Sequence, residues 1–293
     1  MKTAIVADSN CCITPEEARE LGIFILPMPV IVEDKTYFEG VDITFPEFVE
    51  VLAQRKEVST SQPALGAVME LWDKLLEEYD EIVHIPMSSA LSDSCRTAQG
   101  LAEEYRGKVW VVDNRRISGS FRSSVMDARQ MALGGVSGEK IKAELEKTAM
   151  DAMIFVAVET LEYLKRSGRV TAAAAAVSTL LNIKPVLKIE GEKLDAFAKV
   201  RGMNHCREKM LESMRPYVEE FRRKGWPIYL GAASSARDPE DGRAWAEEIA
   251  AAFPEEQVSY LPLGCSISGH VGEGAYGIYL SRCLPEGALS YGE

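Results

Sequence analysis

The 293-residue chain lacks long hydrophobic runs, blocks of basic residues and paired cysteine motifs. No segment approaches the roughly 18–20 consecutive apolar residues that a membrane-spanning helix needs. Lys and Arg number 33 against 45 Asp and Glu, for a net charge of −12. Such a balance disfavours binding to nucleic acid or to an anionic membrane surface. We therefore expect the partner to be a small molecule or another protein.

The cysteines and the first residues indicate a reducing compartment. Six cysteines without C-x-x-C spacing are typical of free thiols in a chain of this size. Cys11 and Cys12 are adjacent, but no His or second cysteine pair lies nearby to complete a metal site. The opening MKTAIVADSN reaches Asp8 without the apolar core of a signal peptide. We expect a cytoplasmic protein with no metal and no cofactor.

The first half alternates short apolar runs with segments of helical periodicity. Strands are expected at 3–8, 81–87 and 108–114, and helices at 64–78, 92–105 and 120–132. This alternation predicts a parallel sheet covered by helices on both faces. Pro27 and Pro29 exclude a central strand through both positions, so 22–40 is predicted as edge structure followed by a hairpin-like turn.

The second half mixes hairpins with helices. Strands are expected at 152–158, 227–233, 257–263 and 274–281, a hairpin at 184–200, and helices at 160–182 (broken near Ser167 and Gly168), 202–224 and 239–253. We predict an α/β protein of two domains. Residues 1–150 would form a three-layer domain with a parallel sheet, and residues 151–293 a two-layer α/β domain with a mixed sheet.

Two clusters of hydroxyl side chains stand before predicted helices. In STSQPA (59–64), Ser61 is expected to cap a helix that starts at Gln62 and Pro63, which leaves Thr60 unexplained. In SSALSDS (88–94), Ser92 is one of several candidate caps. Hydroxyls and free amides at a helix N-terminus can hold an anion, and plain capping is the alternative. Neither cluster is G-x-S-x-G or adjoins a His, which disfavours a nucleophilic serine.

Three further residues stand in motifs that favour contact with a ligand or partner. His270 lies in SISGHVGEGAYG (266–277), where glycines allow close backbone approach, although a lone His is more often structural. A strand rather than a helix is expected to follow, so this is not a dinucleotide-binding loop. Arg169 lies in KRSGRV (165–170) and Arg201 in KVRG (199–202). For the motif of Arg169, an exposed basic turn at the C-terminus of a helix is the alternative explanation. Arg201 stands at the start of a predicted helix, where its positive charge opposes the helix dipole.

Taken in order, several motifs resemble the DegV family of fatty-acid-binding proteins. The matching stretches are ADSNCCI (7–13), TSQPA (60–64), IPMSSALSDSCRTA (85–98), VVDN (111–114), LEYLKRSGRVTAAAAAVSTLLNIKPVL (161–187), KVRG (199–202) and GHVGEGAYG (269–277). The resemblance implies a parallel-sheet domain and a mixed-sheet domain with a long-chain fatty acid between them. It also implies a binding protein, not an enzyme, which in some members presents the acid to a separate kinase subunit.

The resemblance implies roles for individual residues. Thr60 and Ser61 match the first hydroxyl loop, Ser92 the second, and His270 the histidine near the acid head. Arg169 and Arg201 match the basic motifs, where we expect contact with a partner or a phosphate. The kinase subunit of such members resembles dihydroxyacetone kinase and forms an acyl phosphate. Peripheral contact with a membrane during lipid exchange is left open.

The chain also departs from the family pattern. Asp93 and Glu273 add negative charge where a carboxylate is expected, and Asn10 follows Asp8-Ser9 where the family usually has Thr. A carboxylate turned toward the ligand would weaken the site or raise a pKa. Two alternatives therefore stay open. One is a binder of another anionic or phosphorylated molecule, and the other is a hydrolase that uses Ser92 or Ser61 with His270.

Overall fold

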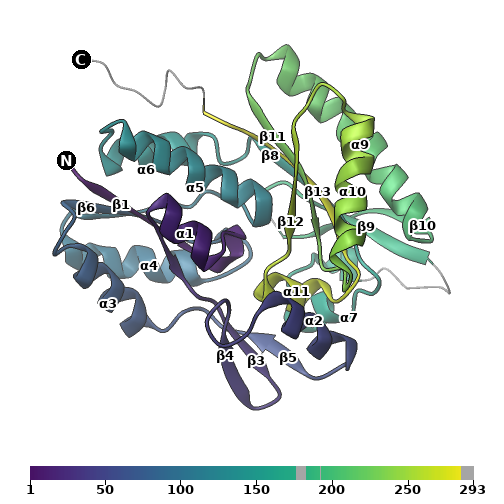
Figure 1. The fold of residues 1–293 in the computed structure, drawn as a ribbon, viewed down its shortest axis with the longest axis horizontal. Coiled ribbons are helices and arrows are strands. Elements are labelled where there is room, and N and C mark those ends of the chain that lie inside the picture. Colours follow the sequence, from purple (N-terminus) through teal and green to yellow (C-terminus); the bar gives the residue numbers. More distant parts are fainter. Residues whose placement is uncertain (176–182, 192, 285–293) are drawn as a thin grey trace.

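The computed structural model describes residues 1–175, 183–191 and 193–284 (Figure 1). Within this part of the chain, two large sheets and one small sheet are joined by helices. None of the described helices is long and apolar enough to cross a membrane. The described residues also contain no cluster of three or more His, Cys, Asp or Glu side chains suited to a metal ion.

The first large sheet is parallel throughout, with strand order β2-β1-β6-β7. Its strands are β1 (Thr3–Asp8), β2 (Ile23–Leu26), β6 (Glu81–Ile85) and β7 (Val109–Val111). Helices α3 (Leu65–Leu75) and α4 (Ser94–Ala102) pack on one face, and α1 (Pro15–Leu21), α5 (Ser118–Leu133) and α6 (Gly138–Lys147) on the other. The strands read as nearly continuous apolar runs because both faces are covered, as predicted.

The second large sheet is mixed, with strand order β10-β9-β8-β13-β11-β12. Its strands are β8 (Ala152–Ala157), β9 (Ile183–Ile189), β10 (Asp195–Arg201), β11 (Ile228–Ser234), β12 (Val258–Pro262) and β13 (Tyr276–Arg282). Only the β11–β12 pair is parallel among these neighbours. Helices α9 (Met203–Arg223) and α10 (Pro239–Ala252) cover its outer face. The predicted hairpin at 184–200 is confirmed as β9 and β10.

Helix α5 lies between the two large sheets (Figure 1). Its fully buried Phe121 and Val125 join one continuous apolar core with Ile5 of β1 and Leu187 of β9. The fold class, α/β with one parallel and one mixed sheet, is therefore confirmed. Because the core crosses the predicted boundary near residue 150, the division into two domains there stays a prediction.

A small antiparallel sheet, order β4-β3-β5, lies beside both halves. It consists of β3 (Pro29–Val32), β4 (Lys35–Phe38) and β5 (Val58–Thr60), and it packs against α2 (Phe45–Ala53) and α11 (Cys265–Val271). The edge segment and hairpin predicted in 22–40 are confirmed as β2, β3 and β4. The sequence analysis did not predict α2, although Thr44 and Glu47 form a hydrogen-bonded start signal there.

The helical segment predicted at 160–182 is interrupted, as expected. Helix α7 (Glu162–Ser167) ends at Gly168, whose φ of 68° is open to glycine without steric cost. A short helix α8 (Ala172–Ala175) follows. The remainder of the predicted segment, 176–182, lies outside the described residues, as do the final residues of the chain, 285–293.

Candidate functional site

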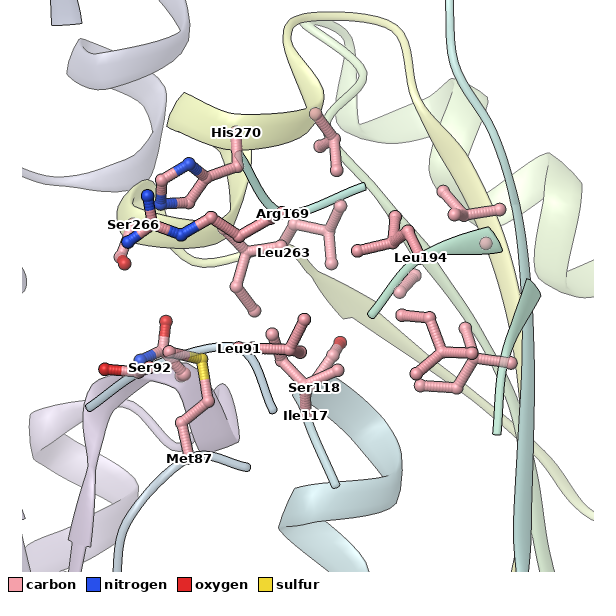
Figure 2. Close-up of a pocket in the computed structure, with 18 of the residues that line it drawn as sticks. Met87, Leu91, Ser92, Ile117, Ser118, Arg169, Leu194, Leu263, Ser266 and His270 are labelled. Carbon is pink, nitrogen blue, oxygen red and sulfur yellow. The ribbon is translucent and has the colours of Figure 1, made fainter. Parts of the chain in front are cut away.

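A pocket opens between the two large sheets and the small one (Figure 2). Its lining is mostly aliphatic, and its polar side chains include Thr60, Ser61, Ser92, Arg169, Ser266 and His270. Figure 2 shows His270, Arg169, Ser266 and Ser92 at one end, with Leu91, Leu263 and Leu194 extending away from them. The centre of a water molecule can occupy about 100 Å³ of this hollow, while the whole space between atoms, with the mouth, is about 920 Å³. The pocket is therefore narrow, with one polar end.

His270 belongs to helix α11 and not to a loop, which corrects the sequence-based interpretation. Its Nε2 atom lies 2.8 Å from Oγ1 of Thr60, at the end of β5. Burial, and then the nearby charges of Arg169 and Arg166, lower the pKa of His270 to about 4. The imidazole is thus neutral at neutral pH, and its buried Nδ1 has no hydrogen-bond partner among the described residues. The pair can offer hydrogen bonds to a ligand head group.

Ser61 lines the pocket but does not cap the following helix. Helix α3 begins at Leu65 with Ala64 as its N-cap, and Ser61 Oγ donates to the carbonyl of Gln62 at 3.2 Å. Pro63 explains the error, because a residue before proline is pushed out of the helical region and Gln62 can therefore not begin the helix. The Ser61 hydroxyl is exposed at the pocket rim.

Ser92 lies just before helix α4, whose N-cap is Asp93. Its Oγ accepts a hydrogen bond from the Ser94 amide at 3.2 Å, at the start of α4, and it lines the pocket. Asp93, whose charge was of concern, pairs with Arg96 on the surface, and its side chain is 74% exposed. Asp93 and Glu273 do not line the pocket, so neither adds a carboxylate to its wall.

The two arginines predicted to contact a partner or a phosphate lie in different places. Arg169 follows Gly168, is half-buried and lines the polar end of the pocket beside His270 (Figure 2). Arg201 ends the edge strand β10 and is exposed, outside the pocket lining. Its carbonyl accepts from Nδ1 of His205 at 2.9 Å. Of these two arginines, Arg169 lines the pocket and Arg201 does not.

Glu39 is a half-buried residue beside the site that the sequence analysis did not predict. Ser9 Oγ donates to its Oε2 at 2.7 Å, and the Cys265 amide donates to Oε1 at the start of α11. Burial raises the pKa of Glu39 to about 7 despite these hydrogen bonds. Glu39 thus anchors the helix that carries His270. Its partners lie 30 and 226 positions away in the chain, so no local pattern could reveal it.

Glu39→Gln should make folding less sensitive to alkaline pH. The folded-state pKa of about 7 lies above the usual 4.5, so the stability linked to protonation is full below pH 4.5 and is lost as pH rises through 7. Raising the pH from 5.5 to 8.5 should therefore lower the free energy of unfolding of the parent by on the order of 2 kcal/mol more than that of the variant. Urea unfolding at both pH values checks this, and a constant difference would contradict the raised pKa.

The fold and the site together define an α/β protein with an apolar pocket that has one polar end. The DegV family model, described as an uncharacterised protein family, matches residues 2–282. The chain therefore belongs to the DegV family, which confirms the resemblance found in the sequence.

Individual relatives cover nearly the whole chain. A DegV domain-containing protein of Deinococcus radiodurans is 30% identical over 281 residues, or 96% of this chain and 98% of that one. A solved structure of a fatty-acid-binding DegV family protein from Thermus thermophilus is 30% identical, with a TM-score of 0.85 over 96% of this chain and 100% of that one. DegV of Bacillus subtilis, a fatty-acid-binding protein, is 27% identical, with a TM-score of 0.83 over 96% and 99% of the respective chains.

Proposed function

We propose that the protein binds a long-chain fatty acid in this pocket, with the carboxylate at Thr60, Ser61, Ser92 and His270. The observation that carries the proposal is the distribution of polarity, because hydroxyls, an imidazole and Arg169 gather at one end of a narrow aliphatic hollow. The fatty acids bound by the Thermus and Bacillus relatives support the same ligand class. A phosphorylated metabolite would leave most of the apolar lining unused.

The physical chemistry of a fatty acid matches both parts of the pocket. Burying a methylene group contributes about 0.8 kcal/mol, so a sixteen-carbon tail offers on the order of 10 kcal/mol before the costs of binding. A buried carboxylate without partners is costly, whereas hydrogen bonds and a cation stabilise the ionised head. Arg169, for which the sequence predicts contact with a partner or a phosphate, would supply that cation.

The first experiment is mass spectrometry of an organic extract from the purified, unheated protein. A fatty acid present in about one copy per chain would support the proposal and identify the preferred length. An empty extract, followed by no binding when fatty acids are added, would overturn it.

Thr60→Ala and Ser92→Ala should each weaken binding of the acid by about 1–3 kcal/mol, the usual loss when a hydrogen bond to a charged group is removed. Displacement of a fluorescent fatty acid measures the change. Ser59→Ala is the matched control, because Ser59 precedes Thr60 in β5 but is exposed and does not line the pocket. Equal affinity in all three variants would remove both hydroxyls from the binding site.

We further propose that a separate kinase subunit, similar to dihydroxyacetone kinase, phosphorylates the bound acid to an acyl phosphate. The family resemblance motivates this step, and the exposed Arg201 would contact that subunit. If so, Arg201→Ala should slow ATP-dependent acyl-phosphate formation in a mixture with such a kinase and leave fatty-acid affinity unchanged. Equal rates for the variant and the parent would remove Arg201 from the contact. We do not propose a Ser/His hydrolase, because the side-chain partner of His270 is Thr60 and not Ser61 or Ser92.

A further inference from the structure

Asn10 contributes a buried, unpaired acceptor to the pocket wall. The residue is 0% exposed and lines the pocket. Its amide nitrogen and backbone N–H both donate to Oδ1 of Asp8, at 2.8 and 3.0 Å. Because an ionised carboxylate only accepts, this contact fixes which amide atom is nitrogen. The Oδ1 atom of Asn10 then has no hydrogen-bond partner among the described residues, which is costly unless a ligand or water donates to it.

Ser118 adds a second polar group on the neighbouring element. Its side chain is 6% exposed and lines the pocket, and its only recorded partner in the described structure is Cys12 Sγ, 3.7 Å away. Cys12 Sγ also lies 3.7 Å from the carbonyl of Asn10, so Asn10 and Ser118 stand on adjoining parts of the wall. Figure 2 places Ser118 next to Ile117, beyond Leu91 when viewed from Ser92. Ser118 therefore lies along the pocket, away from Ser92.

The start of helix α5 supplies hydrogen-bond donors at the same place. This helix spans 16 residues, and no side chain caps its N-terminus at Ile117. Ile117 and Ser118 both line the pocket. The first amide groups of a helix have no partner within the helix and favour an oxygen atom. Asn10 accepts, Ser118 donates or accepts, and the helix start donates.

Of the oxygen groups that commonly stand along an acyl chain, an alcohol satisfies this set of partners. An alcohol donates to Asn10 Oδ1 and accepts from Ser118 or from the helix start. A ketone or a carboxylate has no hydrogen to give, so it would leave the Asn10 oxygen unpaired. An unsubstituted alkyl chain would leave the Asn10 oxygen and the helix start unpaired in a space from which it excludes water.

We infer that the preferred ligand is a fatty acid that carries a hydroxyl group along its chain, held by Asn10 and Ser118. The inference rests on the proposed function, since the same pocket must hold the acid. It adds a second recognition point, separate from the carboxylate end. A wholly apolar tunnel would bind a hydroxylated acid more weakly than the plain acid of equal length. Tighter binding of the hydroxylated acid would therefore indicate a polar partner along the chain.

The test is a displacement series with a fluorescent fatty acid, run on the full chain. The competitors are hexadecanoic and octadecanoic acids and their hydroxylated isomers, with the hydroxyl moved stepwise from carbon 2 toward the tail. One position should bind about tenfold more tightly than the parent acid of equal length, the gain expected from a satisfied hydrogen bond. Ser118→Ala should abolish this advantage, so that in the variant the hydroxylated acid binds no more tightly than its parent acid.

Asn10→Leu tests the acceptor in the same way. It also removes two hydrogen bonds to Asp8, so its thermal unfolding is measured first, and Ser118→Ala carries the test alone if the variant does not fold. Plain acids that bind while every hydroxylated isomer binds equally or more weakly would overturn the inference and leave the proposed function standing. If neither plain nor hydroxylated acids bind, both fail.

Discussion

Arg116→Met should lower the free energy of unfolding by about 3–5 kcal/mol, the cost of removing one member of a buried charged network. Arg116 is 2% exposed and stands just before α5, between the two large sheets. Its guanidinium donates to the carbonyls of Thr148, Ala149 and Asp151, at 2.6, 3.4 and 3.4 Å. It thereby holds the turn through which the chain passes from the first large sheet to the second.

Methionine replaces the apolar stem of Arg116 but none of its donors. The three carbonyls would lose a buried donor, and the hydroxyls of Ser123 and Ser124 would lose a partner as well. Arg116 also lowers the pKa of the buried Asp127, which burial raises to about 7. Without the guanidinium, that pKa should rise further, so the variant should lose more stability at pH 8 than at pH 6.

Urea unfolding followed by circular dichroism measures the difference. Arg19→Met is the matched control, because the Arg19 side chain is 76% exposed and its partners in the described structure, Glu16 and the carbonyl of Pro15, belong to its own helix. It should change stability by less than about 0.5 kcal/mol. A result for Arg116→Met as small as that of the control would show that this network does not stabilise the junction between the sheets.

Tyr279→Ala should cost a similar 3–5 kcal/mol, as expected for truncating a large buried ring, and should also change the preferred ligand. Tyr279 is 3% exposed and lines the pocket from β13. Its ring packs directly against Gly119 of α5 and Gly231 of β11. A Cβ atom added to Gly119 would lie 2.2 Å from the ring, and one added to Gly231 would lie 2.3 Å from the Tyr279 hydroxyl, so the ring leaves no space at either position. The hydroxyl also lies 2.7 Å from Ser259 Oγ.

Because this ring is held on both sides, it should limit how far an acyl chain can extend. Removing it should move the preferred chain length upward in a displacement series from twelve to twenty-two carbons. Tyr279→Phe is the control, since it keeps the ring and loses only the contact with Ser259, at about 0.5–1.5 kcal/mol. An unchanged order of chain lengths in Tyr279→Ala would show that another part of the wall limits the tail.

The local chain alone determined most of the elements. Apolar runs such as 3–8 and 152–158 are strands because their residues cover a pleated surface that is buried on both faces. Gly168 ends a helix because glycine reaches a positive φ without steric cost. These are interactions of near neighbours, so they can be read from sequence, as can the general position of the hydroxyl clusters.

The tertiary structure decided which residues form the site and what each one does there. Thr60 and His270 are 210 positions apart and meet only because α11 packs on the small sheet. Glu39 anchors the start of α11, so a glycine-rich stretch that is typical of a loop becomes a helix. Arg169 and Arg201 stand in similar basic motifs, but only Arg169 faces the pocket. Such placements depend on contacts between distant parts of the chain, and no local pattern of residues contains them.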